Sequence, residues 1–403
     1  MNIVFLTLER IGSITERSIY KELLRCFIQH NHKVYVVSPE ERRYGKKTSY
    51  TKFDGGGLLR VRILNNQKTN IVEKGLSTLL IESQFRKAIE DYLADISFDL
   101  ILYSTPPITF TNVVRSLKKK NSRAISYLLL KDIFPQNAVD IGMFGEKSIF
   151  NCYFRKKEIA LYNISDYIGC MSPANVDYLI NKNSYIDPAR VEIAPNSISL
   201  NNVCLELSQN EKDKIYIRKK YNIPLNRTVF IYGGNLGKPQ GIPFLIDCLT
   251  ANQSREDCFF VIVGSGTELS SIEKWYGEAK PQSAIIMKGL PKEEYDILVR
   301  SCDVGMIFLD HRFTIPNYPS RLLSYLENRI PVLCATDPNT DIGRIAEENG
   351  YGYWCESNSV DAFTTILNRM LKSDRKTMGE KGYMFLKENY LVENTYNVIM
   401  KHV

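Results

Sequence analysis

Short, continuous apolar segments alternate with amphipathic segments of helical periodicity along the whole chain. The strand-like segments are residues 2–8, 33–38, 100–103, 124–130, 167–171 and 191–194 in the first half, and 228–232, 259–263, 284–287, 304–308 and 331–335 in the second. Helical spacing of apolar residues is clearest at 19–30 and 78–93. Apolar strands between helices are typical of parallel sheets covered on both faces. The pattern therefore predicts an α/β protein.

A chain of 403 residues is long enough for two such domains. We expect two doubly wound, Rossmann-like domains, over residues 1–196 and 197–385, with a final helical segment, 386–403, that returns to the first domain. The polar stretch 197–224 suits the connection between them. Ligands bind such sheets at the carboxyl ends of the strands. With two domains facing each other, the cleft between them is the expected site.

Composition excludes several classes of protein. Hydrophobic residues make up 44% of the chain and charged residues 24%, as in ordinary globular proteins. No apolar run approaches the ~20 residues that span a bilayer. Glu9 and Arg10 end the first apolar segment, which therefore resembles a buried strand more than a signal peptide. We expect a cytoplasmic protein.

Metal and disulfide chemistry find little support. The nine cysteines are scattered and never form a Cys-x-x-Cys pair, which argues against a disulfide framework and a zinc site. They are expected to be small core residues. With four histidines and no HExxH sequence, we expect no metal and no cofactor.

Positive charge gathers in the first half of the chain. Residues 1–200 hold 28 Lys and Arg against 20 Asp and Glu, whereas residues 201–403 hold 24 against 25. Basic patches attract phosphorylated substrates or anionic membranes, although a single cluster such as 118–120 is more often a solvated surface. The aromatic and basic segment 149–162 is the candidate for weak, salt-sensitive membrane contact, with a packed helix as the alternative. No nucleic-acid partner is expected.

The strongest local motif is the glycine-rich turn at 232–241, where an apolar strand enters a helix. Gly234 permits close approach of backbone to a ligand, and the helix N-terminus presents free N–H groups to anions. Lys238 adds a positive charge, so a diphosphate fits there. Comparable turns follow the next two strands, at Gly264 and at Leu290. A plain strand-to-helix turn remains the alternative for each.

A second candidate region in this half is the segment 315–327. Ser320 is a suitable helix N-cap, Arg321 can pair with a phosphate, and Ser324 and Glu327 share a helix face. A capped amphipathic helix with solvent-facing charges is the alternative reading.

In the first half, Asp132 follows a wholly apolar strand, so its carboxylate is expected at the site. There it would orient an acceptor hydroxyl or stabilise positive charge on a sugar. A turn or cap aspartate is the alternative.

Taken in order, these motifs resemble the large family of retaining GT-B glycosyltransferases (glycosyl transferases group 1), and within it the bacterial enzymes of capsule, O-antigen and exopolysaccharide assembly. The most specific match is 232–241, which resembles the family's Tyr-Ser-Gly-Asn-x-Gly-x-x-Gln-Gly turn. Further matches are 31–38 (Gly-His-x-Val), 131–135 (Arg-Asp-Leu-Trp-Pro), 158–172, 195–196 (Pro-Asn-Gly), 263–266 (Val-Gly-x-Gly) and 319–321 (Pro-Ser-Lys).

The resemblance implies that the second domain binds a nucleotide-sugar donor and the first domain an acceptor. The diphosphate would contact the turns at Gly234, Gly264 and Leu290, with Lys238 and Arg321 near the phosphates. Gly12, in the loop after the first strand, would approach the donor phosphate. The reaction would be metal-independent and retain the anomeric configuration, with the leaving phosphate deprotonating the acceptor.

The chain departs from the family pattern at four positions. Asn235 and Gln240 stand where many members carry an arginine and a lysine in the phosphate turn. Ser324 replaces the glutamate that holds the nucleotide ribose, and Pro316 replaces a glutamate eight residues earlier. Glu327 lies one turn beyond Ser324.

The preferred interpretation is a transferase that moves a sugar, with UDP foremost as the carrier, to a polyprenyl-pyrophosphate-linked acceptor at the inner face of the plasma membrane. The alternatives are a non-catalytic GT-B partner of another transferase and a sugar-nucleotide epimerase. Epimerases of this fold need acidic and histidine residues around the cleft, and histidines are few here.

Overall fold

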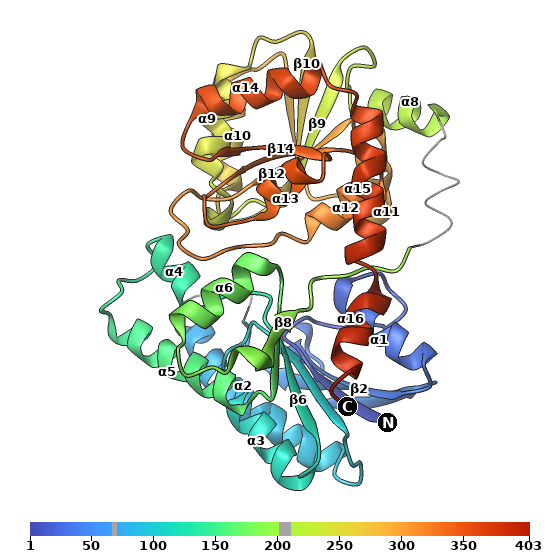
Figure 1. Ribbon diagram of the computed structural model, residues 1–403, viewed down its shortest axis with the longest axis vertical. Helices are drawn as coiled ribbons and strands as arrows, with labels where there is room; N and C mark the ends of the chain where they lie inside the picture. The colour runs from blue at the N-terminus through green and yellow to red at the C-terminus, as the bar shows by residue number, and fades with distance from the viewer. Residues whose placement is uncertain (67–70, 201–210) are drawn as a thin grey trace. The chain divides into compact units, whose positions relative to one another are not determined.

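The computed structural model describes residues 1–66, 71–200 and 211–403, which fall into two compact units (Figure 1). Unit 1 comprises Met1–Ile198 and Val392–Val403, and unit 2 comprises Ser199–Leu391. The chain returns to unit 1 at Val392 rather than at 386. The reason is that α15 (Arg375–Asn389) packs on α12 (Arg321–Glu327) inside unit 2.

The eight-stranded sheet of unit 1 is parallel except for one edge strand. Its spatial order is β3 (Ser49–Phe53), β4 (Gly56–Ile63), β2 (Lys33–Glu41), β1 (Asn2–Leu6), β5 (Leu100–Ser104), β6 (Ile125–Leu129), β7 (Tyr167–Cys170) and β8 (Val191–Ile193). The helices are α1 (Ile19–Gln29), α2 (Ile71–Tyr92), α3 (Thr111–Lys120), α4 (Gln136–Asp140), α5 (Ile149–Ile164), α6 (Pro173–Lys182) and the 3-10 turns Arg42–Tyr44 and Pro188–Arg190. The buried strands confirm the predicted α/β class.

The sequence did not predict the hairpin of β3 and β4. These strands pair antiparallel around Asp54-Gly55, and β4 then joins the sheet beside β2. Only β4 is mostly buried, while β3 is largely exposed, so the apolar pattern of the hairpin is weak. The Asp-Gly dipeptide is the local signal that marks such a turn.

Unit 2 holds a six-stranded, wholly parallel sheet, also as predicted. Its spatial order is β11 (Ala284–Lys288), β10 (Cys258–Ser265), β9 (Thr228–Asn235), β12 (Val304–Phe308), β13 (Val332–Thr336) and β14 (Gly352–Glu356). The remaining helices are α8 (Glu211–Lys220), α9 (Ile242–Ala251), α10 (Leu269–Ala279), α11 (Lys292–Ser301), α13 (Ile342–Glu348), α14 (Val360–Leu371) and the 3-10 turn Lys238–Gln240. Strand β14 was not predicted.

The prediction that the polar, charged segment 197–224 connects the two domains is wrong for its last part. Residues 201–210 lie outside the described residues, but α8 follows them and belongs to unit 2. Arg218 of α8 is only 2% exposed. It donates hydrogen bonds to the Ser301 carbonyl oxygen (2.8 Å) and to Asp303 Oδ2 (2.8 Å). The charged helix α8 therefore contains one buried guanidinium group, that of Arg218, which is hydrogen-bonded within unit 2.

Helix α16 (Val392–Met400) packs on α1 and completes unit 1. His32 Nε2 lies 3.0 Å from the Tyr396 hydroxyl, and the ring of His30 stacks on Tyr396 with centroids 4.2 Å apart. After the helix, His402 stacks on Tyr167 at 3.6 Å. Three of the four histidines thus hold the end of the chain.

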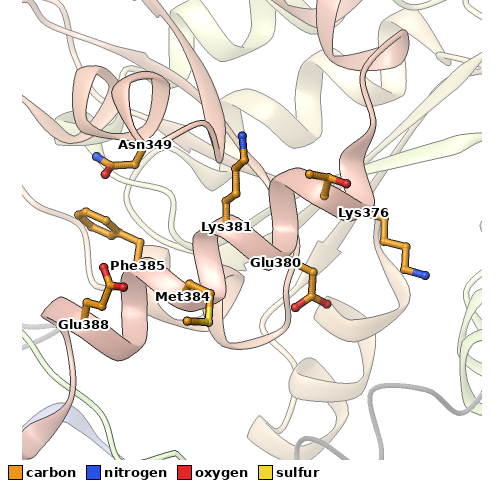
Figure 2. Close-up of a pocket in the computed structure, with 8 residues that line it drawn as sticks. Asn349, Lys376, Glu380, Lys381, Met384, Phe385 and Glu388 are labelled. Atoms are coloured by element: carbon orange, nitrogen blue, oxygen red, sulfur yellow. The ribbon is translucent and has the colours of Figure 1, made fainter.

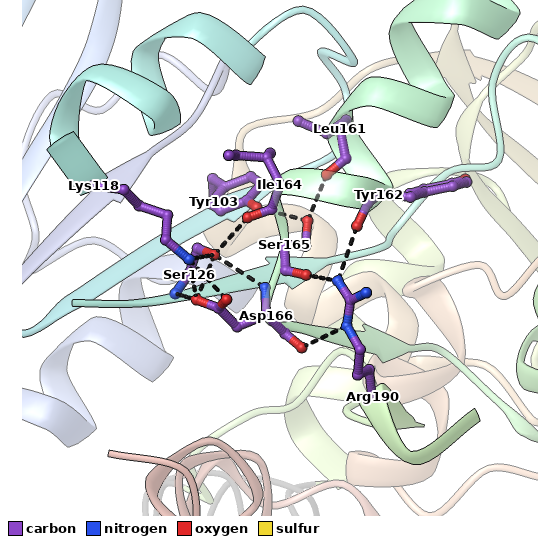
Figure 3. Close-up of polar contacts among 9 residues, drawn as sticks. All are labelled: Tyr103, Lys118, Ser126, Leu161, Tyr162, Ile164, Ser165, Asp166 and Arg190. Atoms are coloured by element: carbon purple, nitrogen blue, oxygen red, sulfur yellow. Dashed lines mark hydrogen bonds and ion pairs between the residues drawn. The ribbon is translucent and has the colours of Figure 1, made fainter. Parts of the chain in front are cut away.

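A polar network crosses unit 1 at the amino ends of β6 and β7 (Figure 3). Asp166 accepts hydrogen bonds from Lys118 Nζ and from the backbone N–H and hydroxyl of Ser126, at 2.7 to 2.8 Å. Arg190 Nε donates to the Asp166 carbonyl oxygen at 3.0 Å. Lys118 is therefore a structural residue rather than part of a solvated basic cluster.

The structure also bears on the expectations about the cysteines and about membrane-spanning segments. Of the cysteines that the structure describes, all are free, and all except the exposed Cys152 are buried, as predicted for small core residues. In the same parts of the chain, no helix has both the length and the apolar character needed to cross a bilayer.

Candidate active site

In unit 2, the glycine-rich turn leaves the sheet at the carboxyl end of β9. Gly234 has φ +125°, a conformation that side chains rarely adopt, and it is exposed together with Asn235 and Lys238. The Tyr232 hydroxyl donates to the Asn235 carbonyl oxygen at 2.6 Å and fixes the turn from below. The turn therefore presents backbone and one lysine to solvent.

The next turn supports the first one. Any side chain at Gly264 would collide with the Gly234 carbonyl oxygen, because β9 and β10 run side by side to this point. Leu236 N–H also donates to the Ser265 carbonyl oxygen at 2.9 Å. The geometry gives Gly264 a packing role: it allows the two turns to lie against each other.

Arg321, the first residue of α12, lies beside this turn. Its Nη2 donates to Gln240 Oε1 at 2.7 Å, and its Cζ lies 4.3 Å from the centroid of the Tyr232 ring. A methyl group added to Gly234 would be 3.6 Å from Nη2. Arg321 Nη1 is buried, and no hydrogen-bond partner for it occurs among the described residues. A fixed guanidinium with an unused donor thus adjoins the exposed backbone of the turn.

Several contacts hold the loop that leads into α12. Asn317 N–H donates to Thr340 Oγ1 at 3.0 Å, and Asn339 Nδ2 donates to the Phe313 carbonyl oxygen at 2.7 Å. The predicted cap at Ser320 is wrong. Ser320 occupies the N-cap position, but it has helical backbone angles and makes no capping hydrogen bond. Tertiary contacts therefore position this helix.

The remaining residues predicted to bind the nucleotide-sugar donor differ in how far they are exposed. Ser324 is partly exposed on α12, and Leu290 is partly exposed after β11. Glu327, in contrast, is 8% exposed and already has an interaction partner. Its burial makes it a poor replacement for a carboxylate at the position of Ser324.

Tyrosines surround Arg321, and the sequence did not single them out. Tyr232 lies under the guanidinium, and the Tyr295 hydroxyl is so close to Gly233 that any side chain there would collide with it. Burial raises the pKa of Tyr295 to about 12, so it stays neutral. Tyr232 and Gln240 lie within the predicted turn, but only the fold shows that both contact Arg321.

In unit 1, Asp132 follows β6 and is held by its neighbours. Its backbone N–H donates to Thr105 Oγ1 at 3.1 Å, and Asn137 Nδ2 donates to Asp132 Oδ1 at 2.7 Å. Burial raises the pKa of Asp132 to about 6. Next to it, Lys131 Nζ donates to the Ala194 carbonyl oxygen at 2.9 Å, and burial lowers the pKa of Lys131 to about 7. Both side chains titrate near neutrality, a common property of functional sites.

Gly12 lies in the exposed loop after β1, the same sheet whose strand β6 leads to Asp132. Arg60 of β4 anchors the loop through the carbonyl oxygens of Ile11 and Gly12. The structure thus places Gly12 and Asp132 after the carboxyl ends of strands in unit 1. Over the described ranges, no group of three or more His, Cys, Asp or Glu side chains gathers as a metal site would need.

A shallow cavity of about 670 Å³ lies along α15 in unit 2 (Figure 2). It is lined by Asn349, Lys376, Thr377, Glu380, Lys381, Met384, Phe385 and Glu388. None of the predicted site residues lines it. Lysines and glutamates alternate along it, and Glu380 pairs with Arg329 at 2.8 Å, so the cavity has no excess of positive charge for a phosphate.

Residues 213–385 match the family model for glycosyl transferases group 1. The chain is 24% identical over 265 residues to the probable glycosyltransferase WbjE of Pseudomonas aeruginosa, covering 65% of this chain and 64% of that protein. It is also 24% identical over 160 residues to the putative colanic acid biosynthesis glycosyl transferase WcaI of Escherichia coli K12, covering 38% of each. The chain thus matches less than two thirds of the length of either relative.

Solved structures match nearly the whole chain. A structure described as trehalose-6-phosphate from E. coli bound with UDP-2-fluoro glucose has a TM-score of 0.75 at 10% identity, covering 99% of this chain and 98% of that one. Anabaena Alr3699/HepE in complex with UDP has 0.69 at 12%, covering 100% and 99%, and WaaG, a glycosyltransferase of lipopolysaccharide biosynthesis, has 0.65 at 12%, covering 98% and 99%. At such identities the likeness shows the fold, which is GT-B. The chain therefore has the GT-B fold, and its residues 213–385 match the glycosyl transferases group 1 model.

Proposed function

We propose that the chain transfers a sugar from a nucleotide-sugar donor, with UDP foremost as the carrier, to an acceptor in the synthesis of a bacterial surface polysaccharide. Unit 2 binds the donor through the turn at Gly234 and Asn235, the residues near Leu290, and Ser320 and Ser324 of the α12 region. Unit 1 binds the acceptor near Asp132, with Gly12 approaching the donor phosphate.

One observation carries this proposal: the buried, unpartnered Nη1 of Arg321 beside the exposed turn. A buried guanidinium N–H without a partner is costly, and an anion satisfies it best. The exposed backbone of Gly234 adjoins Arg321, and the exposed Lys238 belongs to the same turn. A diphosphate offers oxygens to all three groups at once.

The proposed reaction retains the configuration and needs no metal or cofactor. The bond from the anomeric carbon to the diphosphate oxygen breaks, and a bond to the acceptor oxygen forms on the same face. The acceptor proton passes to the leaving diphosphate, whose negative charge Arg321 and Lys238 stabilise. Asp132, ionised above its pKa of about 6, orients the acceptor hydroxyl or stabilises positive charge on the sugar.

The names of the relatives support a role in surface polysaccharide synthesis. WcaI is named for colanic acid biosynthesis and WaaG for lipopolysaccharide biosynthesis. We propose a sugar on a polyprenyl pyrophosphate at the inner face of the plasma membrane. The basic excess of residues 1–200 suits such an anionic acceptor.

The first experiment is a thermal-shift panel of UDP, GDP and the corresponding nucleosides against the full chain. A ligand at ~100 times its dissociation constant adds roughly 2.7 kcal/mol of stability, which is easily seen. We expect a shift with one diphosphate and a much smaller one with its nucleoside. Sugar transfer and its stereochemistry are then followed by NMR of the anomeric proton.

The absence of a carboxylate at Ser324 favours one second candidate, a non-catalytic GT-B partner of another transferase. A chain that melts cooperatively, responds to no nucleotide and binds a second transferase tightly would support that function instead. The epimerase alternative would release an altered nucleotide sugar without any acceptor.

A further inference from the structure

The start of α5 exposes large apolar side chains to an unusual degree. Ile149 is 86% exposed, Phe150 67% and Tyr153 37%, and Met143, in the segment between α4 and α5, is 61% exposed. We call these four residues, with Lys147 and Lys156, the apolar tip. Figure 1 shows the segment between α4 and α5 and the helix α5, which carry these residues. Large apolar side chains that are exposed this close together in the chain are candidates for an interaction site.

The tip is rigidly supported, so its exposure is a stable property of unit 1. Ser148 caps α5 by accepting a hydrogen bond from Asn151 N–H at 3.1 Å. Behind the tip, Phe154 packs edge-on against Phe134 with centroids 4.9 Å apart, and Phe144 joins them at 6.2 to 6.3 Å. The tip is therefore presented by an aromatic cluster and does not result from a loose helix end.

The second half of α5 has a different role. Glu158, Leu161 and Tyr162 are buried, and the Tyr162 hydroxyl donates to Glu158 Oε1 at 2.8 Å. The packed-helix interpretation of residues 149–162 therefore holds for the later turns of α5, whereas its first two turns are exposed.

Positive charges border the apolar side chains. Lys147 and Lys156 are exposed, and Lys157 lies 5.8 Å above the Tyr153 ring while pairing with Glu82 at 3.8 Å. Ile149 and Lys156 are two helical turns apart, roughly 10 Å at 1.5 Å per residue. Lys147 and Lys156 thus flank the exposed apolar side chains along the chain, so their ammonium groups can reach lipid phosphates while those side chains enter the interface.

We propose that the apolar tip inserts into one leaflet of a bilayer containing anionic phospholipid. Met143, Ile149 and Phe150 enter the acyl region, Tyr153 lies at the interface, and Lys147 and Lys156 contact lipid phosphates. Phe134 links this surface to the site, since it belongs to the supporting cluster and follows Asp132 by two residues. Insertion therefore brings the loop of Asp132 to the membrane surface, where a lipid-linked acceptor presents its sugar.

The test is sedimentation of the full chain with phosphatidylcholine vesicles with and without phosphatidylglycerol. We expect binding that is stronger with phosphatidylglycerol, weakened by salt, and still measurable at high salt because of the apolar contribution. I149S/F150S should lower the partition coefficient by about tenfold or more. The matched control is L79S/L80S, which removes two exposed apolar side chains (57% and 43%) from α2 of the same unit. It should bind as the original chain does.

Three results would overturn the proposal: no binding to either vesicle, unchanged binding by I149S/F150S, or equal losses in both variants. Self-association or capture of a protein by the tip without vesicle binding would count against it too. The test is independent of sugar transfer. If nucleotides fail to bind while the tip variants still lose vesicle binding, the proposed function fails and the membrane surface stands.

Discussion

Replacing Arg321 by methionine tests whether this side chain is the main cation for the donor phosphates. Methionine keeps an apolar contact with Tyr232 but removes the donor Nη1 and the charge. Hydrogen bonds to charged groups contribute about 1.5–3 kcal/mol, and leaving a partner unsatisfied costs a similar amount. We therefore expect UDP, or whichever diphosphate binds, to bind about 10- to 150-fold more weakly.

Lys238→Met is the matched control, since it removes a cation from the same turn. Lys238 is exposed, and exposed charge pairs contribute about 0.2–1 kcal/mol. A loss of only about two- to fivefold is expected there. Gln240→Leu should fall between the two, because it removes the acceptor that orients Arg321 at 2.7 Å.

The assay is isothermal titration of each variant with the nucleoside diphosphate and with the nucleoside. The nucleoside has no phosphates, so its affinity should be the same for the original chain and for all three variants. Equal losses for Arg321→Met and Lys238→Met would refute the reasoning from burial. A parallel loss of nucleoside binding would show that Arg321 acts by supporting the fold.

Three further substitutions test other parts of the structure. Burial raises the pKa of Asp132 from 3.8 to about 6, so between these values the folded state holds a proton that the unfolded state has lost. The free energy of unfolding therefore falls as pH rises from about 4 to about 6. Asp132→Asn should remove this fall, on the order of 2 kcal/mol, in thermal melts recorded across that range. Asp166→Asn should lower the free energy of unfolding by about 1–3 kcal/mol in urea titrations at neutral pH, because it weakens the hydrogen bonds from Lys118 and Ser126. A change below ~0.5 kcal/mol would mean that solvent replaces these hydrogen bonds. Gly264→Ala should separate the two turns and weaken nucleotide binding at least ~tenfold. Gly277→Ala on α10, where nothing lies within 4 Å, should leave nucleotide binding unchanged. Equal behaviour of the two variants would contradict the packing role of Gly264.

The strands that carry the site could be predicted because their sequences leave little choice. The apolar residues of segments such as β9 and β12 are buried on both faces, so these segments appear in the sequence as short, largely apolar runs. The hairpin of β3 and β4 escaped prediction because one strand is exposed. Its stability comes from pairing with β2, which no local pattern reveals.

The roles of single side chains were harder to predict. Lys238 and Arg321 look equally suitable in the sequence, but one is exposed and the other is fixed by Gln240 and Tyr232, residues 81 and 89 positions away. Ser320 has the right identity for a cap, yet contacts from Thr340 and Asn339 determine the start of the helix. Long-range contacts of this kind are decided by the fold.

The packing of α16 on α1 also affects how the protein is made. Ile399 belongs to the same core cluster as Leu24 and Phe27, two residues that the ribosome adds early in synthesis. That core stays open while all of unit 2 emerges, so unit 1 acquires its last apolar contacts only after unit 2 has been synthesised. The first unit to be synthesised is therefore the last to be finished. A premature stop just before Val392 would spare unit 2 and leave unit 1 exposed to proteases and chaperones.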